Sequence, residues 1–405
     1  MKALILLEHT FLIDENNKVW SEIVVDYNYL KRYLEVFENI ILCARMKKVK
    51  NSDVLLKKYN LLVSGENVEF VALPFATSSK EILLTYIKTK IIFKKAIKDA
   101  ECAIIRGPSL LSLLLYKNCV NKINFSVEFV MGANEILSNK NFLRKIANKY
   151  LDRTAKKMCL QANGVSYVTE KLLQMKYPSR SIMDNKNSHD YFSTYYSSID
   201  LFKSEFKEKK WNINDKPNEF VIINIGSMAT DRKGQERLLK ISKRIIDDGY
   251  NIKVKFLGDG KKKETLQSIS KELEISQNVE FLGNINEKVE VFKLLHDSHF
   301  FVLPTSSEGL PRVIIEAMAT GTPCISSNVD GIPELLDSDN LFNYTDIDGF
   351  VARIEYLMDN WAEMISISKK NHNKAQQYEY SKLKKRRNDF FQCLKSLTKN
   401  NIGEG

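Results

Sequence analysis

Short apolar runs alternate with amphipathic stretches along most of the chain, and this alternation constrains the fold more than any other feature. The short runs predict buried strands, and apolar residues spaced three or four apart between them are typical of helices. Such an alternation predicts an α/β fold with mostly parallel sheets. In the first half we expect strands at residues 3–7, 39–44, 68–73, 102–105, 125–130 and 164–168, and helices at 27–37 and 80–98.

A polar, lysine-rich stretch at residues 202–219 interrupts the pattern and carries turn residues without periodicity, as interdomain connections do. A second series follows it, so the 405 residues predict two doubly wound domains of about 200 residues each. In such sheets ligands bind at the carboxyl ends of strands. In the second series we expect strands at 220–225, 253–258, 279–281, 300–303 and 323–326, and helices at 235–248, 261–273, 287–296, 313–320 and 349–359.

Composition excludes several classes of protein. A chain with 44% hydrophobic and 27% charged residues is expected to be soluble and globular, and no apolar run approaches the roughly 18 residues of a membrane span. The apolar start of the chain closes at Glu8, which is too early for a secretory signal and predicts a buried first strand. Six widely spaced cysteines without a Cys-x-x-Cys pair predict reduced thiols and a cytoplasmic location.

The net charge of +11 is unevenly distributed. Residues 1–200 hold 30 Lys and Arg against 20 Asp and Glu, and residues 80–157 hold sixteen against six. This asymmetry indicates an anionic partner, either nucleic acid or an anionic membrane surface, with a merely solvated lysine-rich surface as the alternative. Because the basic half shows no recognition module and no repeated aromatic-basic pattern, we expect no nucleic acid.

The most informative segment is residues 300–334. A strand there ends in a small polar loop, and the helix that starts near Arg312 turns its free amides toward that loop, where they suit an anion or a sugar hydroxyl. Glu308 lies in the loop, and Glu316 follows about two turns into the helix, at ~3.6 residues per turn, on the same side. Two carboxylates beside such a loop suit a sugar nucleotide, and the alternative is one surface and one helix-face glutamate.

This segment resembles the donor-binding segment of the retaining glycosyltransferases of family 4. The matching motif reads Glu308-Gly309-Leu310-Pro311, then Glu316-Ala317-Met318-Ala319-Thr320-Gly321-Thr322-Pro323. The continuation Asp330-Gly331-Ile332-Pro333-Glu334 is similar to the family's Gly-Gly-x-Pro-Glu turn, with Asp330 where the first Gly is usual. The resemblance implies a GT-B fold, in which two Rossmann-like domains face a cleft and a carboxy-terminal helix crosses back to the amino domain.

A second motif, from Gly226 to Gly234, resembles the family's diphosphate-binding loop, in which an Arg and a Lys hold the donor. Lys233 matches, with Arg232 beside it, but Ser227 stands where the Arg is usual. One cationic contact is therefore missing or supplied by Arg232. Two further glycine turns, at residues 256–260 with Gly258 and at 281–284 with Asn284, are similar to those lining the donor cleft, and the resemblance places Asn284 near the nucleobase.

The resemblance implies an acceptor-binding domain at residues 1–205, with 375–405 packing back on it, and a donor-binding domain at 206–374. Lys233 and Glu308 are implied as catalytic residues: Lys233 neutralises the departing diphosphate, and Glu308 with the amides around Gly309 orients the transferred sugar. Glu316 is implied to bind ribose hydroxyls. The implied donor-binding set is Gly226, Ser227, Arg232, Lys233, Gly258, Asn284, Glu308, Gly309, Leu310, Pro311 and Glu316.

We expect no cofactor and no metal. The five histidines lack metal-ligand spacing, and the late Asp337-Ser338-Asp339 and Asp346-Ile347-Asp348 triplets are typical of turns and caps. The resemblance implies a retaining transfer of sugar from a nucleotide-diphosphate donor to a glycan or lipid-linked saccharide, in capsule or other surface polysaccharide biosynthesis. The implied place is the inner face of the plasma membrane, as a peripheral protein.

The first half resembles the family more loosely. No Gly-Gly turn follows the first strand, where residues 9–17 stand instead, and residues 128–132 replace the His that many members carry. Two alternatives therefore remain, a GT-B sugar-nucleotide epimerase or hydrolase and a non-catalytic homologue acting as a scaffold. The basic end, residues 369–399 with ten Lys and Arg against two acids, is either a solvated helix or the helix that returns to the amino domain.

Overall fold

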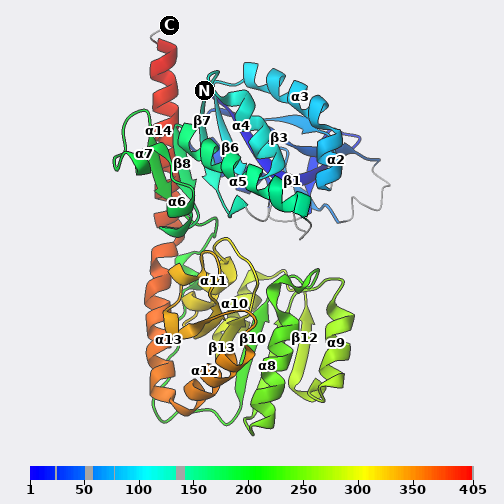
Figure 1. The fold of residues 1–405 in the computed structure, drawn as a ribbon, viewed down its shortest axis with the longest axis vertical. Coiled ribbons are helices and arrows are strands. Elements are labelled where there is room, and N and C mark those ends of the chain that lie inside the picture. Colours follow the sequence, from blue (N-terminus) through cyan, green and yellow to red (C-terminus); the bar gives the residue numbers. More distant parts are fainter. Residues whose placement is uncertain (23–24, 51–57, 77, 134–141, 404–405) are drawn as a thin grey trace. The chain divides into compact units, whose positions relative to one another are not determined.

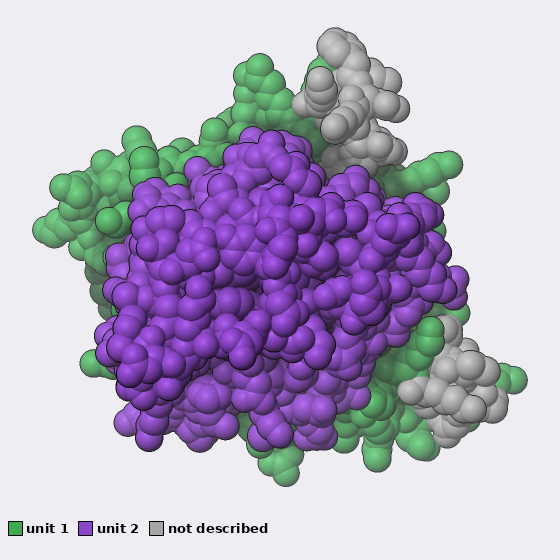
Figure 2. All heavy atoms as spheres, turned by 90° about the horizontal axis from the view of Figure 1, so that it is seen from below, with its two compact units in different colours: residues 1–196, 384–405 green, residues 197–383 purple. Residues whose placement is uncertain are grey.

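The computed structural model describes residues 1–22, 25–50, 58–76, 78–133 and 142–403. The chain divides into two compact units, residues 1–196 with 384–405 and residues 197–383, which Figure 2 colours separately. The sequence placed the corresponding bounds at 205/206 and 374/375. Each unit is built around one sheet, and the two sheets follow the same strand order.

The first unit contains a nine-stranded sheet with a parallel core. Its central strand β1 (Lys2–Ile13) pairs with β3 (Asn39–Lys48) on one side and β6 (Cys102–Gly107) on the other. Outward from β3 lies β5 (Val68–Leu73); outward from β6 lie β7 (Asn124–Phe129), β8 (Gly164–Tyr167) and β9 (Phe192–Tyr195). Two short antiparallel strands, β2 (Val19–Ser21) and β4 (Leu61–Leu62), extend the sheet.

Helices of the first unit lie against this sheet (Figure 1). They pack on it through apolar side chains such as Phe93 and Leu115. The helix expected at residues 80–98 is two helices, because the chain breaks at Thr85, whose hydroxyl donates to the carbonyls of Glu81 and Ile82. The helices are α1 (Tyr27–Leu34), α2 (Ser79–Leu84), α3 (Tyr86–Lys98), α4 (Leu110–Cys119), α5 (Phe142–Gln161), α6 (Leu172–Lys176) and α7 (Arg180–Met183).

The second unit contains a six-stranded parallel sheet. Its order is β12 (Val279–Gly283), β11 (Ile252–Leu257), β10 (Phe220–Ile225), β13 (Phe300–Leu303), β14 (Cys324–Ser327) and β15 (Leu341–Phe342). The observed bounds of β10 and β13 are those that the sequence predicts. The helices around this sheet are α8 (Gln235–Asp247), α9 (Lys263–Glu272), α10 (Lys288–Asp297), α11 (Arg312–Ala319), α12 (Ile347–Asp359) and α13 (Trp361–Ala375).

The last helix, α14 (Tyr380–Gly403), begins in the second unit and continues as part of the first. Within the first unit, Phe391 packs on Tyr33 with ring centroids 5.3 Å apart, and Lys395 pairs with Glu38 at 2.7 Å. Lys384 pairs with Glu35 at 2.8 Å. Part of the basic charge at the end of the chain is therefore neutralised by acidic side chains of the first unit.

Both sheets have a point where the strand order reverses, between β1 and β6 in the first and between β10 and β13 in the second. Loops leaving adjacent strands on opposite sides of such a point diverge, and ligands bind in the crevice they leave. The two reversal points are therefore the places where the fold positions functional side chains. Among the described residues, no helix combines the length and apolar character needed to cross a bilayer.

Candidate active site

The loops that follow β10 and β13 are tied together at the reversal point of the second unit. The amide of Ser306 donates to the carbonyl oxygen of Arg232 at 2.9 Å. Gly234 has a φ of +77°, and a Cβ there would lie 2.0 Å from the carbonyl oxygen of Pro304. Only glycine permits this backbone conformation and this close approach, so the motif's last glycine sets the distance between the two loops.

The carboxylate of Glu308 gathers three donors from these loops. Its Oε1 accepts from Nζ of Lys233 at 2.5 Å, from the Arg232 guanidinium at 3.1 Å and from the Thr305 hydroxyl at 3.3 Å. The Glu308 and Lys233 side chains are only 9% and 13% exposed, whereas Arg232 is 45% exposed. The structure thus brings together the two predicted catalytic residues and adds Arg232 to them.

Gly226 provides the space in which the Lys233 side chain lies. A Cβ at Gly226 would meet the aliphatic carbons of Lys233 at 3.0–3.3 Å. Ser227 is exposed, and its hydroxyl accepts from the amide of Ala229 at 3.2 Å, so it forms a local turn. The second cation of this cluster is therefore Arg232, which stands in the short 3₁₀ turn Asp231–Lys233.

Asp330 holds the Glu308 loop from the other side. Its carboxylate accepts from the amide of Glu308 at 2.8 Å and from the Ser307 hydroxyl at 3.2 Å. Its φ is +46°, in the left-handed region that glycine tolerates best and that Asp and Asn enter more readily than most residues. From the sequence, Asp330 was only a departure from the Gly-Gly turn, and this role was not predicted. The available signal was an Asp in a position where glycine is usual.

Glu316 differs from Glu308 in its surroundings. It lies on α11, partly buried, and burial raises the pKa of its carboxyl, an effect that Arg312 partly opposes. Within the described part of the chain, no group donates a hydrogen bond to this carboxylate. Its oxygens remain available to accept hydrogen bonds from a ligand, which is what hydroxyl recognition requires.

The remaining predicted donor residues form the edge around this cluster. Leu310 and Pro311 are buried and lead into α11, and the carbonyl of Gly309 accepts from the amide of Gly331 at 2.9 Å. Gly258 has a φ of +134°, and a Cβ there would lie 2.2 Å from the carbonyl oxygen of Gly226. Asn284 is exposed just after β12, at the outer end of the same sheet edge.

The reversal point of the first unit carries a carboxylate that the sequence analysis missed. Between the pairs Leu6–Cys43 and Thr10–Arg45, three residues of β1 face one residue of β3, and this bulge contains Glu8. The Glu8 carboxylate accepts from the Ser109 hydroxyl and lies 3.8 Å from the Arg45 guanidinium. Burial raises the pKa of Glu8, although its side chain is still 31% exposed. Bulges re-aim side chains at sheet edges in this way.

Glu128, in the segment that stands where family members carry a His, belongs to a buried network. It is 3% exposed and accepts from the hydroxyls of Tyr33 at 2.8 Å and Tyr196 at 2.9 Å. The Arg106 guanidinium lies 3.5 Å from the same carboxylate. Burial and the Glu128 charge raise the pKa of both tyrosines, so the network stays intact at neutral pH and connects α1 to β7 and to the residue that follows β9.

The late Asp-x-Asp triplets hold local structure. Asp346 caps α12 by accepting from the amide of Gly349 at 3.0 Å, and Asp337 pairs with Lys370 at 2.6 Å. In the ranges that the structure describes, no group of three or more His, Cys, Asp or Glu side chains is arranged to hold a metal ion.

Several known proteins are similar to this chain in sequence. Residues 204–379 match the model of the family "Glycosyl transferases group 1". The chain is 27% identical over 347 residues to Protein CapJ of Staphylococcus aureus, covering 85% of this chain and 83% of CapJ. It is 30% identical over 217 residues to the uncharacterized glycosyltransferase MJ1059 of Methanocaldococcus jannaschii, covering 52% of this chain and 50% of that protein.

Solved structures show the same fold at low sequence identity. The lipopolysaccharide outer core galactosyltransferase WaaB superposes with a TM-score of 0.62 at 16% identity, covering 96% of this chain and 99% of WaaB. HepE of Anabaena, solved with UDP, superposes with a TM-score of 0.64 at 14% identity, covering 97% and 100%. The chain therefore has the GT-B fold, and its residues 204–379 are similar to the group 1 glycosyl transferases.

Proposed function

We propose that this protein is a retaining glycosyltransferase of family 4 that moves a sugar from a nucleotide-diphosphate donor to a glycan or lipid-linked saccharide in surface polysaccharide biosynthesis. The observation that carries the proposal is the cluster of Lys233, Arg232 and Glu308 at the reversal point, with the unbonded carboxylate of Glu316 nearby in sequence. The names of CapJ and of the HepE complex with UDP-glucose support a capsule-type pathway and a nucleotide-sugar donor.

In this proposal Lys233 and Arg232 neutralise the donor diphosphate, which gains negative charge as the glycosidic bond breaks. Fixed cations aimed at developing charge lower the barrier more than they stabilise the bound substrate. Glu308 holds both cations and contacts the transferred sugar, and Glu316 accepts hydrogen bonds from ribose hydroxyls. The acceptor hydroxyl attacks the anomeric carbon from the face that the phosphate leaves, and the departing phosphate oxygen takes its proton.

The proposal places the protein at the cytoplasmic face of an anionic membrane, attached through the first unit. Helices α2 and α3 expose large apolar side chains, with Leu83 62%, Leu84 77%, Ile87 72% and Ile91 64% exposed. Lysines alternate with them along the same helices. Each lysine held near an anionic leaflet contributes about 1 kcal/mol, so a few of them give reversible attachment without a membrane span.

Incubation of the purified protein with a panel of labelled sugar nucleotides and with lipid-linked and free saccharide acceptors tests this proposal. The proposed enzyme forms an elongated saccharide with the donor's anomeric configuration and is unaffected by EDTA, since the two cations take the role of a metal. Epimerised or hydrolysed donor without transfer indicates the epimerase or hydrolase. Absence of any turnover with a donor that binds indicates a scaffold.

A further inference from the structure

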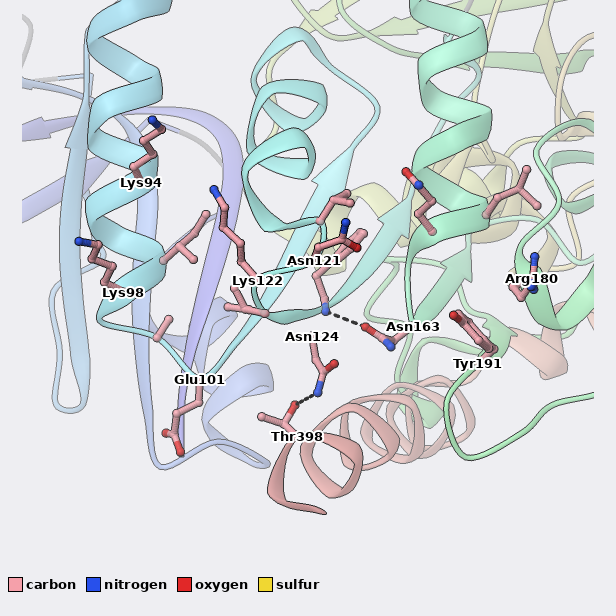
Figure 3. Close-up of a pocket in the computed structure, with 17 residues that line it drawn as sticks. Lys94, Lys98, Glu101, Asn121, Lys122, Asn124, Asn163, Arg180, Tyr191 and Thr398 are labelled. Atoms are coloured by element: carbon pink, nitrogen blue, oxygen red, sulfur yellow. Dashed lines mark hydrogen bonds between the residues drawn. The ribbon is translucent and has the colours of Figure 1, made fainter. Parts of the chain in front are cut away.

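The first unit contains a pocket of about 1220 Å³ at the edge of the sheet opposite its reversal point (Figure 3). Asn124, the first residue of β7, and Asn163, just before β8, lie on its wall, as does Glu101, just before β6. The pocket is therefore at the amino ends of these strands. Glu8 and the Ser109 loop lie at the carboxyl ends, so this pocket is separate from the reversal point of the first unit.

Three lysines give the pocket its charge. Lys94 and Lys98 come from the last turns of α3, and Lys122 comes from the turn between α4 and β7. Among the described residues, none of the three has a carboxylate within 4 Å. The other charged groups on the wall have partners, since Arg180 pairs with Asp184 at 3.5 Å and Glu101 accepts from the amide of Lys2 at 2.5 Å.

One polar side chain on the wall, Gln161, adds a donor to the three lysines, whereas the amides of Asn124 and Asn163 donate to Thr398 and Asp190. The side-chain oxygen of Gln161 accepts from the Tyr116 hydroxyl, which leaves the amide NH₂ of Gln161 for a ligand. The side-chain oxygen of Asn163 accepts from the amide of Phe125 at 3.1 Å. A pocket wall with three lysine ammonium groups and the amide NH₂ of Gln161 suits a ligand rich in anionic oxygens, of which a phosphoryl group is the densest.

The two lysines of α3 continue an apolar stripe on the same helix face. Ile87, Ile91, Lys94 and Lys98 are spaced four, three and four residues apart, which places them on one side of the helix. Ile87 and Ile91 are 72% and 64% exposed. The stripe is thus apolar where it approaches the pocket and basic where it forms the pocket wall. This order matches that of a lipid, whose apolar acyl chains are joined to an anionic head.

We propose that this pocket binds the phosphoryl headgroup of a membrane lipid, with Lys94, Lys98 and Lys122 on the phosphate oxygens and Ile87 and Ile91 among the acyl chains. The site deepens the membrane attachment proposed above and rests on it. It adds selection among anionic lipids, because a phosphomonoester offers more charge and more free oxygens to the three lysines than a phosphodiester does.

Sedimentation of the full chain with vesicles tests the site. Phosphatidylcholine vesicles carry either phosphatidic acid or phosphatidylglycerol, adjusted to equal electrophoretic mobility, and pure phosphatidylcholine is the blank. We expect about tenfold tighter binding to phosphatidic acid than to phosphatidylglycerol. The triple variant Lys94→Gln, Lys98→Gln, Lys122→Gln loses this preference. The matched control Lys88→Gln, Lys90→Gln, Lys95→Gln removes the same charge from exposed α3 positions off the pocket wall, and it weakens binding to both vesicles while keeping the preference.

Equal binding of the wild type to the two anionic vesicles, or equal loss of preference in both triple variants, would overturn the pocket. If the protein still binds both anionic vesicles, the proposed membrane attachment holds although the lipid site is wrong. If it binds neither, both proposals fail, so the two outcomes are distinguishable. Glycerol 1-phosphate is a soluble ligand with the same phosphoryl group but no acyl chains. If it binds as tightly as phosphatidic acid vesicles, and the double variant Ile87→Ser, Ile91→Ser changes neither affinity, the assignment to a lipid is wrong. Unchanged thermal unfolding of each variant excludes a folding defect.

Discussion

Nζ of Lys233 lies 2.5 Å from Oε1 of Glu308, so the two residues that the sequence predicts as catalytic form one ion pair. Their side chains are 13% and 9% exposed, and an ion pair so shielded from solvent is screened less than a surface pair. The Arg232 guanidinium shares the same carboxylate oxygen at 3.1 Å. A change at any of these three residues therefore alters the charge available at the other two.

Replacing Glu308 by Ala should separate turnover from affinity. The variant loses the carboxylate that is proposed to orient the transferred sugar, so we expect kcat to fall about 100-fold or more. Nucleotide-diphosphate affinity should stay equal or increase, because Lys233 and Arg232 lose the carboxylate that they share. Steady-state kinetics and calorimetric titration with the nucleotide diphosphate measure the two effects. A variant with unchanged kcat and weakened nucleotide binding would contradict this role.

Replacing Glu316 by Ala should act mainly on binding. Contacts to ribose hydroxyls are nearly equal in ground and transition states, so their loss raises the KM for the donor about tenfold and changes kcat little. Glu290→Ala on α10 is a control of the same charge change. If Glu316→Ala lowers kcat and leaves the donor KM unchanged, the assignment to ribose is wrong.

Replacing Ser227 by Arg should restore the usual family cation without harming the site. Ser227 is exposed, and its hydroxyl accepts from the amide of Ala229 within a local turn, so the side-chain change alters a local contact. We expect nucleotide-diphosphate affinity to stay equal or to rise several-fold, within the ~1.5–3 kcal/mol of a charge-assisted hydrogen bond. Calorimetry is the direct measurement. A several-fold loss of affinity would show that Arg232 already fills the position that the new side chain needs.

The stability of the second unit should rise with pH above neutrality because of Lys209. This side chain is 4% exposed, donates to the carbonyl oxygens of His296 and Ser298, and has its pKa lowered by burial to about 7. Between that value and the ordinary value of 10.5 the unfolded chain binds the proton and the folded chain does not, so stability increases as pH rises. Denaturant unfolding at pH 7, 8 and 9 follows this rise.

The matched variant for that measurement is Lys209→Met, which keeps an unbranched side chain and removes the titrating ammonium group. In this variant the unfolding free energy should change little between pH 7 and pH 9. The control is the same substitution at the exposed neighbour, Lys210→Met, which should keep the wild-type rise. An equal rise in wild type and Lys209→Met would show that other groups cause it.

Helices and strands with strong apolar patterns could be predicted from the sequence. Bulges and very short strands could not. The bounds of β5, β10 and β13 agree with the pattern, because each is a short apolar run between turn residues. β1 continues to Ile13, beyond the expected end at residue 7, because its bulge places polar Glu8 inside the strand and hides the continuation. β4 has two residues, too few to form any periodic signal.

The residues of the proposed donor site are named from the sequence, but their contacts could not be predicted from it. Lys233 and Glu308 are 75 residues apart, and they meet because β10 and β13 are neighbouring parallel strands whose following loops start at the same edge of the sheet. The role of Asp330 depends on a left-handed backbone that brings its carboxylate to the amide of Glu308. Glu8 had no motif at all, since its position depends on the bulge and on the Ser109 loop of another strand.

Calorimetric titration of Lys233→Ala with nucleotide diphosphates is the most direct test of the central claim that the Lys233–Arg232–Glu308 cluster binds the donor diphosphate. Ser227 stands where the family's Arg is usual, so Lys233 and Arg232 are the two cations of the cluster, and Lys233 is the more buried of them. Its loss should weaken binding at least about tenfold, the equivalent of ~1.5 kcal/mol. Lys240→Ala on α8, which removes an exposed lysine paired with Glu236, should bind as the wild type does. Unchanged affinity of Lys233→Ala for every nucleotide diphosphate that the wild type binds would contradict the account.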